Sequence, residues 1–354
     1  METQKVLLSV KDLHVNFRVR GRELSAIRGI SLDFYAGECV AIVGESGSGK
    51  SVFTKTFSGM LEKNGYISGG SITFYADGPV ELSSLHRNRQ WEQLRGGQIA
   101  TVFQDPMSSL NPVLTIGKQI TSVIRKHRRC SPQQAKALAL QMMEKVGIPQ
   151  PEKRFDDYPF QYSGGMRQRI VIAIALACHP KILICDEPTT ALDVTIQAQI
   201  LKLLKDLQKE LGFTIIFITH DLGVVANIAD RVAVLYAGQM VELGTAEDIF
   251  YDPRHPYTWA LLQSLPQLAQ PGSRLYSIPG TPPSLYSQLQ GDPFAPRNPY
   301  CLKIDTMQQP PMFQVTDTHF AKTWLLDPRA PKIEKPEALR DLHKRLGEEF
   351  GSYG

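Results

Sequence analysis

The feature that most constrains the fold is a glycine-rich stretch of eight residues: Gly44, Glu45, Ser46, Gly47, Ser48, Gly49, Lys50 and Ser51. Before it stands Cys39–Val43, an apolar run with the length and β-branching of a buried strand. After it, residues 52–57 contain no helix breaker and are expected to form a helix. Glycines tolerate backbone conformations that other residues resist, so the loop can turn sharply between these elements. The order strand, glycine-rich loop and helix predicts an α/β fold.

The spacing Gly-x4-Gly-Lys-Ser within this stretch fits a P-loop. In a P-loop, backbone N–H groups and the start of the following helix hold phosphate groups. Lys50 is then expected to reach the β- and γ-phosphates, and Ser51 to be a ligand of Mg²⁺. The alternative is a glycine-rich turn that binds nothing. Because the lysine, the serine and the preceding strand all stand at the positions that a P-loop requires, we favour the phosphate site.

Composition restricts the class of protein. The chain has 354 residues, of which 42% are hydrophobic, so it can form one large domain, or a domain with an appendage, around a substantial core. A net charge of +4 is too small to indicate nucleic-acid binding by itself. The longest apolar stretch, Ile170–Cys178, is too short to span a bilayer, and Met1–Lys5 lacks a signal-peptide pattern. We therefore expect a soluble, cytoplasmic protein. Its five scattered cysteines form no disulfide framework, and we expect Cys39 and Cys185 in the core.

The N-terminal half alternates between strand and helix patterns. Residues 6–35 are expected to form two strands joined at Gly21, because apolar residues such as Leu13 and Val15 alternate with polar ones. A short strand is expected at Ser71–Tyr75. Turns around it are expected at four glycines: Gly65, Gly69, Gly70 and Gly78. Residues 116–150 have helical spacing of apolar residues, with Ser131 as the cap of a second helix.

A second candidate anion site precedes another helix. Ser163 fits an N-cap, and Gly164 and Gly165 leave the first N–H groups of the helix uncovered. Alone, this pattern is weak evidence for binding. Further upstream, a strand expected at Ile99–Phe103 ends at Gln104.

Two more apolar runs that predict buried strands end in polar residues. Lys181–Cys185 leads to Asp186 and Glu187, and Phe213–Thr219 leads to His220. Ligands of open α/β sheets bind at the carboxyl ends of strands, so all three are candidate site residues. Side chains alternate along a strand, so the two carboxylates are expected to point to opposite sides. Asp186 then suits Mg²⁺, whereas Glu187 faces the γ-phosphate and orients or deprotonates water. A strand that simply ends in solvated charges does not account for the P-loop upstream.

The last third of the chain changes in composition. It contains 15 of the 24 prolines, which predicts a loop-rich region over residues 270–335. Asp193 or Thr195 is expected to cap the helix before this region, and Tyr257–Leu265 to form a short helix. Pro336–Glu349 has the pattern of a charged amphipathic helix.

The motifs in chain order resemble those of ATP-binding-cassette (ABC) ATPases. In that family's terms they are Walker A at 44–51, the Q-loop at Gln104, the signature Ser163-Gly164-Gly165-Met166, Walker B with the catalytic glutamate at Asp186-Glu187, the D-loop Ala191-Leu192-Asp193 and the switch histidine His220. The resemblance covers roughly residues 6–245. It implies an α/β P-loop NTPase fold with a RecA-like core, an antiparallel β subdomain and a helical subdomain at about 105–165. It also implies a nucleotide-binding domain at 1–250 and a small loop-rich extension at 251–354.

The resemblance implies ATP and Mg²⁺ as ligands and two nucleotide-binding subunits that enclose each ATP head to tail. Ser51, Gln104 and, through water, Asp186 would hold Mg²⁺, while Glu187 acts as general base and His220 stabilises the γ-phosphate. Ser163, Gly164 and Gly165 would act on the ATP of the partner.

Two further roles follow from the resemblance. Phe17 is the candidate aromatic residue that stacks on adenine, and an ordinary strand aromatic is an equally good interpretation. Asp193 belongs to the D-loop, which lines the nucleotide site in this family.

A narrower resemblance is to the D-type ATPase subunit of bacterial oligopeptide and dipeptide importers. Four stretches carry it: residues 104–112, 163–169, 249–258 and 278–280. It implies a related second ATPase in a heterodimer, two transmembrane permeases and an external peptide-binding protein. It also implies a place at the cytoplasmic face of the membrane, bound through the permeases. Nickel importers share much of this pattern, so a nickel or other small-solute cargo is the alternative.

The chain departs from that family at the positions of four cluster-binding cysteines. Asp292, Asn298 and Asp305 stand where cysteines would be, and Cys301 is the remaining thiol. Iron–sulfur clusters use four thiolates, so we predict no cluster. Phe160 stands where relatives often have histidine, and we have no physical account of it.

Two rival functions fit the motifs less well. Soluble ABC ATPases that act on nucleic acid or ribosomes usually carry two cassettes or a long coiled-coil insertion, and neither is present here. A clamp that binds ATP without hydrolysis does not need Glu187 and His220. We therefore expect a hydrolysing transport ATPase.

Overall fold

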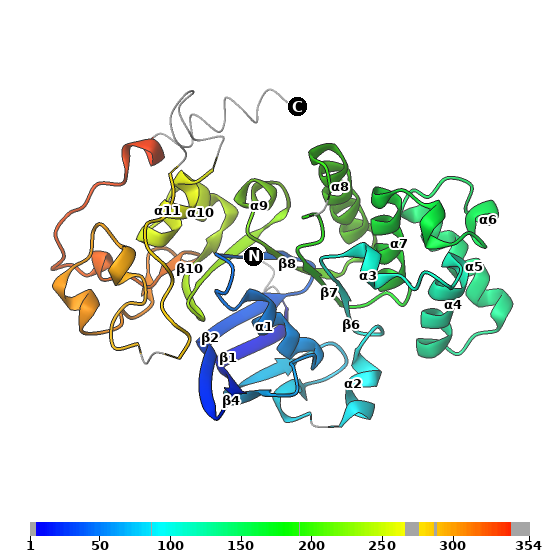
Figure 1. The fold of residues 1–354 in the computed structure, drawn as a ribbon, viewed down its shortest axis with the longest axis horizontal. Coiled ribbons are helices and arrows are strands. Elements are labelled where there is room, and N and C mark those ends of the chain that lie inside the picture. Colours follow the sequence, from blue (N-terminus) through cyan, green and yellow to red (C-terminus); the bar gives the residue numbers. More distant parts are fainter. Residues whose placement is uncertain (1–4, 86, 191, 266–275, 287–288, 341–354) are drawn as a thin grey trace.

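A large mixed sheet lies at the centre of the molecule, with a small antiparallel sheet against it (Figure 1). A group of helices flanks it on one side and the C-terminal region on the other (Figure 1). The structure is a computed structural model, and it describes residues 5–85, 87–190, 192–265, 276–286 and 289–340. Within this described part of the chain, no helix has the length and apolar character needed to cross a bilayer.

The small sheet has four strands in the order β2, β1, β4 and β5, all antiparallel. Their bounds are β1 Val6–Val19, β2 Arg22–Tyr35, β4 Gly65–Phe74 and β5 Val80–Glu81. The predicted pair of strands over residues 6–35 is confirmed, with its turn at Gly21.

Among the described residues, the main sheet has eight strands. In spatial order they are β11 Phe313–Gln314, β12 Phe320–Ala321, β10 Gln239–Thr245, β9 Arg231–Tyr236, β3 Cys39–Val43, β8 Thr214–Thr219, β7 Ile182–Asp186 and β6 Ile99–Val102. The five strands from β9 to β6 pair in parallel, whereas β10, β11 and β12 pair antiparallel. The predicted strand at Cys39–Val43 is confirmed with both of its bounds.

The described helices connect and cover these strands. They are α1 Lys50–Lys55, α2 Asn88–Leu94, α3 Pro106–Ser109, α4 Ile116–His127, α5 Pro132–Lys145, α6 Pro151–Arg154, α7 Gly164–Leu176, α8 Val194–Leu211, α9 Leu222–Ile228, α10 Ala246–Tyr251 and α11 Pro256–Gln263. The predicted cap at Ser131 is confirmed, because its hydroxyl accepts a hydrogen bond from the backbone N–H of Gln134.

Alternation along the central strands builds a core on each face of the main sheet. In β8, Ile215 and Phe217 pack with the helices α4, α5, α7 and α8. Ile216 and Ile218 face the other way and pack with residues of the antiparallel sheet. Cys185 is fully buried in the first of these clusters, as is Cys39, so the prediction that both are core residues is confirmed.

The sequence predicted turns at all four glycines between residues 65 and 78, and this is wrong for three of them. Strand β4 begins at Gly65, so Gly65, Gly69 and Gly70 lie inside a strand that is longer than the predicted Ser71–Tyr75. Gly70 has a φ of +81°, and a Cβ there would lie 2.2 Å from the carbonyl oxygen of Asp12. The pairing of β1 with β4 shifts its register at this point, so Gly69 and Gly70 lie at a β-bulge.

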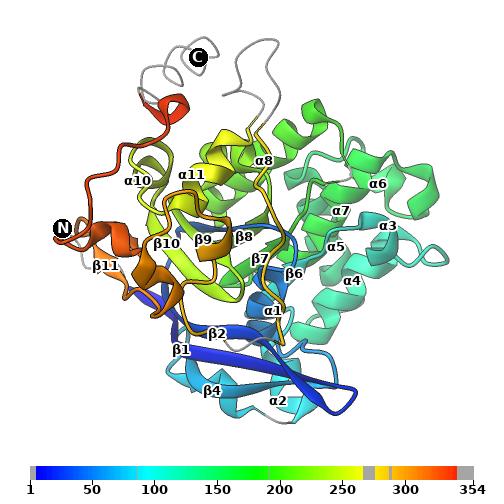
Figure 2. The same cartoon turned by 60° about the vertical axis from the view of Figure 1, so that its left-hand side comes forward.

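The described part of the C-terminal region is loop-rich, as its composition predicted, and it also contains two short strands. Strand β12 pairs with β10 and β11 pairs with β12, so this region extends the main sheet (Figure 2). The predicted helix at Pro336–Glu349 is wrong in its described part, where Glu337–Leu339 form a single 3-10 turn; residues 341–349 lie outside the described residues. The expected domain boundary at 250/251 falls within α10, and the division into two domains stays a prediction.

A buried hydrogen bond between a histidine and a glutamate attaches this region to the sheet. Glu242 of β10 and His319 have fully buried side chains, and His319 Nε2 lies 2.8 Å from Glu242 Oε1. The same carboxylate accepts backbone hydrogen bonds from Arg254 at 2.6 Å and His255 at 3.1 Å. One carboxylate therefore satisfies buried donors from the segment before β12 and from the connection between α10 and α11.

Replacing this carboxylate should destabilise the fold. Glu242→Ala leaves three buried donors without an acceptor, so we expect the free energy of unfolding to fall by about 3 kcal/mol. Urea unfolding followed by circular dichroism measures this loss. As a control, Glu247→Ala on the exposed first turn of α10 should change it by less than about 1 kcal/mol. Equal losses for the two variants would contradict the role of Glu242.

Candidate functional site

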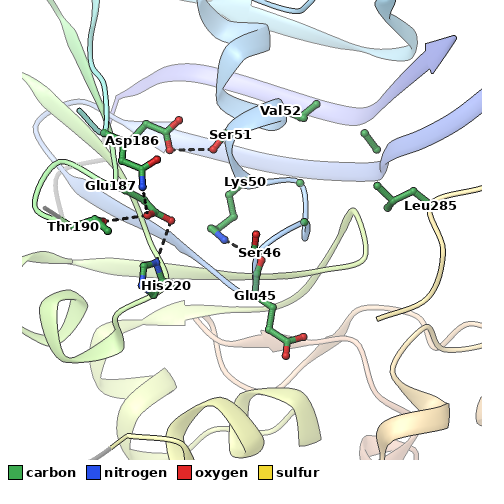
Figure 3. A pocket seen from close by; sticks show the side chains of 14 residues that line it. Glu45, Ser46, Lys50, Ser51, Val52, Asp186, Glu187, Thr190, His220 and Leu285 are labelled. Atoms are coloured by element: carbon green, nitrogen blue, oxygen red, sulfur yellow. Dashed lines mark hydrogen bonds and ion pairs between the residues drawn. The ribbon is translucent and has the colours of Figure 1, made fainter. Parts of the chain in front are cut away.

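The predicted site residues meet at one edge of the main sheet. Strands β3, β6, β7 and β8 are parallel, so their carboxyl ends lie side by side. A cavity of about 740 Å³ opens at this edge and is lined by P-loop residues together with Gln104, Asp186, Glu187 and His220 (Figure 3). The structure therefore brings these four residues together with the P-loop, and their roles stay predictions.

The P-loop holds its lysine by backbone oxygens. Lys50 Nζ donates hydrogen bonds to the carbonyl oxygens of Gly44 at 2.7 Å and Glu45 at 3.0 Å. Burial lowers the pKa of Lys50, and the negative charges of Glu187 and Asp186 oppose this effect. Because carbonyl dipoles rather than a carboxylate hold the ammonium group, its charge can act on an anion in the cavity. Phosphate groups are anions that suit this arrangement.

The hydroxyl of Ser51 and the carboxylate of Asp186 lie beside Lys50 and can serve as metal ligands. Ser51 Oγ donates a hydrogen bond of 3.0 Å to Asp186 Oδ1. Burial raises the pKa of Asp186, the hydrogen bond from Ser51 lowers it, and the neighbouring Glu187 raises it again. Mg²⁺ prefers such oxygen ligands and keeps several waters. The two side chains therefore fit the predicted magnesium site.

Glu187 is the centre of a polar cluster at the other end of the cavity (Figure 3). Its carboxylate accepts hydrogen bonds from Gln104 Nε2 at 3.2 Å and Thr190 Oγ1 at 3.1 Å, and it lies 3.1 Å from His220 Nδ1. The polar groups around this carboxylate hold it at the cavity wall. A carboxylate held in this way can orient or deprotonate a water molecule.

Strand alternation predicted that the two adjacent carboxylates point to opposite sides. This prediction is wrong. Both Asp186 and Glu187 line the same cavity. The reason is that β7 ends at Asp186, and Glu187 has a φ of +48°, which turns its side chain out of the strand pattern. Their partners still differ, since Asp186 contacts Ser51 and Glu187 contacts His220.

Other predicted site residues lie outside the cavity lining. Ser163 caps α7 by accepting from the N–H of Met166, and Asp193 caps α8 by accepting from the N–H of Ile196, so both N-cap predictions are confirmed. Gly164 is exposed, and a Cβ on Gly165 would lie 2.8 Å from Ile196. Ala191 of the predicted D-loop lies outside the described residues.

Phe17 also lies apart from the cavity. It belongs to β1, and its ring packs over Gly65, where a Cβ would lie 2.6 Å from the nearest ring atom. The pocket-lining side chains do not include it. Its proposed stacking on adenine stays a prediction.

Three residues that hold the P-loop could not be inferred from the sequence. Arg297 forms two hydrogen bonds with the Glu45 carboxylate, at 2.6 and 3.0 Å, and its side chain is only 4% exposed. These bonds raise the pKa of Arg297, and the same guanidinium donates a hydrogen bond of 3.2 Å to the hydroxyl of Tyr236. The backbone N–H of Glu45 donates to the hydroxyl of Tyr257 at 2.8 Å.

The three positions at which the family resemblance implied cysteines hold buried polar residues here. Asp292, Asn298 and Asp305 each accept one backbone N–H, from Phe294, Tyr300 and Leu302 respectively. Burial raises the pKa of Asp292 to about 6, the N–H of Phe294 lowers it, and the nearby Asp305 raises it. Among the described residues, no group of three or more histidine, cysteine or acidic side chains is arranged to hold a metal. The absence of an iron–sulfur cluster stays a prediction.

The fold and the site together define a member of the ABC transporter ATP-binding proteins. The family model "ABC transporter" matches residues 27–190, and the model "Oligopeptide/dipeptide transporter, C-terminal region" matches residues 241–304. Within this class, the chain belongs to the family of oligopeptide and dipeptide transport ATP-binding proteins. The resemblance inferred from the motifs is thereby confirmed.

The relatives match over almost the whole chain. The oligopeptide transport ATP-binding protein AmiE of Streptococcus pneumoniae is 62% identical over 98% of this chain and 97% of its own length. OppD of Bacillus subtilis is 56% identical over 97% of this chain and 96% of its own. DppD of Lactococcus lactis, a dipeptide transport ATP-binding protein, is 53% identical over 98% and 99%.

Solved structures support the fold. The ATP-binding cassette MJ0796, solved as a dimer in a post-hydrolysis state bound to ADP and Pi, has a TM-score of 0.59 and 27% identity. It covers 68% of this chain and 99% of its own. The cassette cbiO1 of Clostridium perfringens has a TM-score of 0.60 and 29% identity, and covers 70% of this chain and 92% of its own. The predicted fold class is confirmed.

The pair between Arg297 and Glu45 should contribute to stability. Arg297→Gln leaves the Glu45 carboxylate without its cation, so we expect the free energy of unfolding to fall by about 2 kcal/mol. Arg297→Lys should lose less, because it keeps the charge but not the two-pronged geometry. Urea unfolding measures both. Arg329→Gln, which removes the pair between an exposed guanidinium and Asp327, should leave the unfolding curve unchanged, and a loss as large as that of Arg297→Gln would contradict the assignment.

Asp292 should make stability depend on pH. Its folded pKa of about 6 lies above the ordinary aspartate value, so between about pH 4 and 6 the folded protein binds more protons than the unfolded chain. Stability from this group therefore falls as the pH rises through that range. Asp292→Asn keeps the acceptor for Phe294 and should be more stable than wild type at about pH 7, with a smaller difference at about pH 4. Urea unfolding across this range tests it, and a difference independent of pH would contradict it.

Proposed function

We propose that this chain binds ATP with Mg²⁺ in the cavity at the sheet edge and hydrolyses it to power the import of oligopeptides. The observation that carries the proposal is the meeting of Lys50, Ser51, Asp186, Glu187 and His220 in one cavity. The near full-length identity to oligopeptide and dipeptide transport ATP-binding proteins supports peptides as the cargo. A nickel or other small-solute cargo is the alternative, and no observation favours it.

The residues of the cavity divide the chemistry between them. Lys50 and the P-loop backbone neutralise and position the phosphates. Ser51, Gln104 and, through water, Asp186 would hold Mg²⁺, which would further neutralise the phosphate charge. Glu187 accepts the proton of the attacking water, because its carboxylate is held at the cavity wall by Thr190, Gln104 and His220. His220 stabilises the charge that develops on the γ-phosphate.

One chain supplies only part of the site. The N-cap Ser163 and the first helical residues Gly164 and Gly165 of α7 do not line the cavity, and Ser163 and Gly164 are exposed. We infer that they contact the ATP of a second, related ATPase subunit, with Asp193 nearby in a heterodimer. The dimeric state of the MJ0796 cassette supports such an assembly.

The remaining partners follow from the family. The names of the relatives support an assembly with membrane permeases, and we propose two of them, together with an external peptide-binding protein. The chain then lies at the cytoplasmic face of the membrane, bound through the permeases. The helical segment between Gln104 and Ser163, which includes α4, α5 and α6, is proposed to pass the movement to the permeases. No nucleic-acid partner is proposed.

Loss of the proposed base should separate binding from hydrolysis. Glu187→Gln keeps the size and most hydrogen bonds of the side chain but cannot accept a proton, so turnover should fall by about 100-fold or more. Binding of MgATP should persist, and light scattering should detect a dimer trapped with ATP. Phosphate release and calorimetric titration measure the two effects. Glu210→Gln, at an exposed carboxylate of α8, is the matched control and should hydrolyse normally. Hydrolysis at the wild-type rate in Glu187→Gln would remove Glu187 from this role.

A further inference from the structure

A segment of the C-terminal region forms part of the cavity wall. Leu285 lines the same cavity as Lys50 and Ser51, although it stands more than two hundred residues later in the chain. In Figure 3, the cluster of Glu187 and His220 lies on one side of Lys50, and Leu285 lies on the other. The described residues 276–286 therefore bring a side chain to the end of the cavity opposite the carboxylates.

Leu285 is held in this place by strand β2. Its carbonyl oxygen accepts two hydrogen bonds, from the backbone N–H of Ser25 at 3.1 Å and from Arg28 Nη2 at 3.0 Å. Ser25 and Arg28 flank Ala26, which lines the cavity as well. A second, smaller cavity of about 160 Å³ lies between P-loop residues and the side chains of Pro282, Pro283 and Leu285.

Arg297 ties the same segment to the P-loop. Its Nε donates to the carbonyl oxygen of Pro279 at 2.8 Å, and its Nη2 donates to that of Ile278 at 3.4 Å. The same guanidinium holds the carboxylate of Glu45. The buried guanidinium of Arg297 therefore fixes the position of residues 278–279 relative to the P-loop.

The chemistry of this end of the cavity differs from that of the other end. If the phosphates lie against Lys50 with the γ-phosphate toward Glu187 and His220, the nucleoside extends in the opposite direction. There the wall is apolar, formed by Ala26, Val52 and Leu285. Apolar side chains with few polar groups suit the ribose carbons and the base rather than a phosphate.

We propose that Leu285 contacts the nucleoside part of ATP, and that residues 278–285 are a nucleoside-binding element that the C-terminal region supplies to the site of its own chain. The proposal rests on the proposed function, in which this cavity binds MgATP. It gives the C-terminal region a direct part in nucleotide affinity.

The test compares two probes on the full chain by calorimetric titration. MgATP carries a nucleoside, and magnesium tripolyphosphate carries phosphates only. Leu285→Ala should bind MgATP about fivefold more weakly, because part of an apolar contact is lost. Its affinity for magnesium tripolyphosphate should equal that of wild type. Unchanged affinity for MgATP, or an equal loss for both probes, would overturn the nucleoside contact.

Two further variants distinguish a failure of this proposal from a failure of the proposed function. Lys50→Ala should lose affinity for both probes, and if it binds MgATP as wild type does, the proposed function fails whatever Leu285 does. Tyr286→Ala is the matched control, because its exposed ring lies over Arg22 and lines neither cavity. Its affinity for MgATP should be that of wild type. A loss equal to that of Leu285→Ala would mean that displacement of the segment, not a contact of Leu285, causes the effect.

Wild-type protein provides a measurement that does not depend on any variant. Amide hydrogen exchange of residues 276–286 should slow on addition of MgATP and slow less on addition of magnesium tripolyphosphate. Exchange that is unchanged by MgATP, or slowed equally by both probes, would contradict the proposal.

Discussion

The parallel pairing of β3, β6, β7 and β8 is the constraint on which the rest of this structure depends. Parallel strands present their carboxyl ends at one edge of a sheet, and here each strand continues into a residue type with its own chemistry. The P-loop follows β3, and His220 follows β8. Asp186 is the last residue of β7, and Glu187 follows it. Since these strands are buried on both faces, the apolar packing that stabilises the sheet also holds the reactive groups in register.

In the cavity at this edge, the buried ammonium group of Lys50 lies near the carboxylates of Asp186 and Glu187. Burial lowers the pKa of Lys50 and raises that of Asp186, and each charge partly offsets the effect of burial on the other. Glu187 belongs to the same group of charges but leaves the strand with a positive φ, which places it among Gln104, Thr190 and His220. A phosphate-binding end and a water-activating end thus lie within one cavity.

The C-terminal region is part of the nucleotide domain's structure as well as an extension of it. Glu242 and His319 attach it to β10 by a buried pair, and β12 extends the sheet. Tyr257, in the stretch 249–258 that suggested a peptide-transport family, holds the backbone of Glu45 through its hydroxyl. Arg297 holds the side chain of the same glutamate. The residues that carry the narrower family resemblance therefore include direct supports of the P-loop, which gives that stretch a physical role.

The sequence by itself determined the features that depend on a few consecutive residues. It was sufficient for the strand, loop and helix around Gly44–Ser51, for the N-caps at Ser131, Ser163 and Asp193, and for the buried strands that lead to Asp186 and His220. Only the tertiary structure decided contacts between distant residues, because such contacts leave no local pattern. The pair between Glu45 and Arg297, the place of Leu285 in the cavity and the close approach of Gly70 to Asp12 are of this kind. In each case the partner, not the residue itself, determines the conformation or the role.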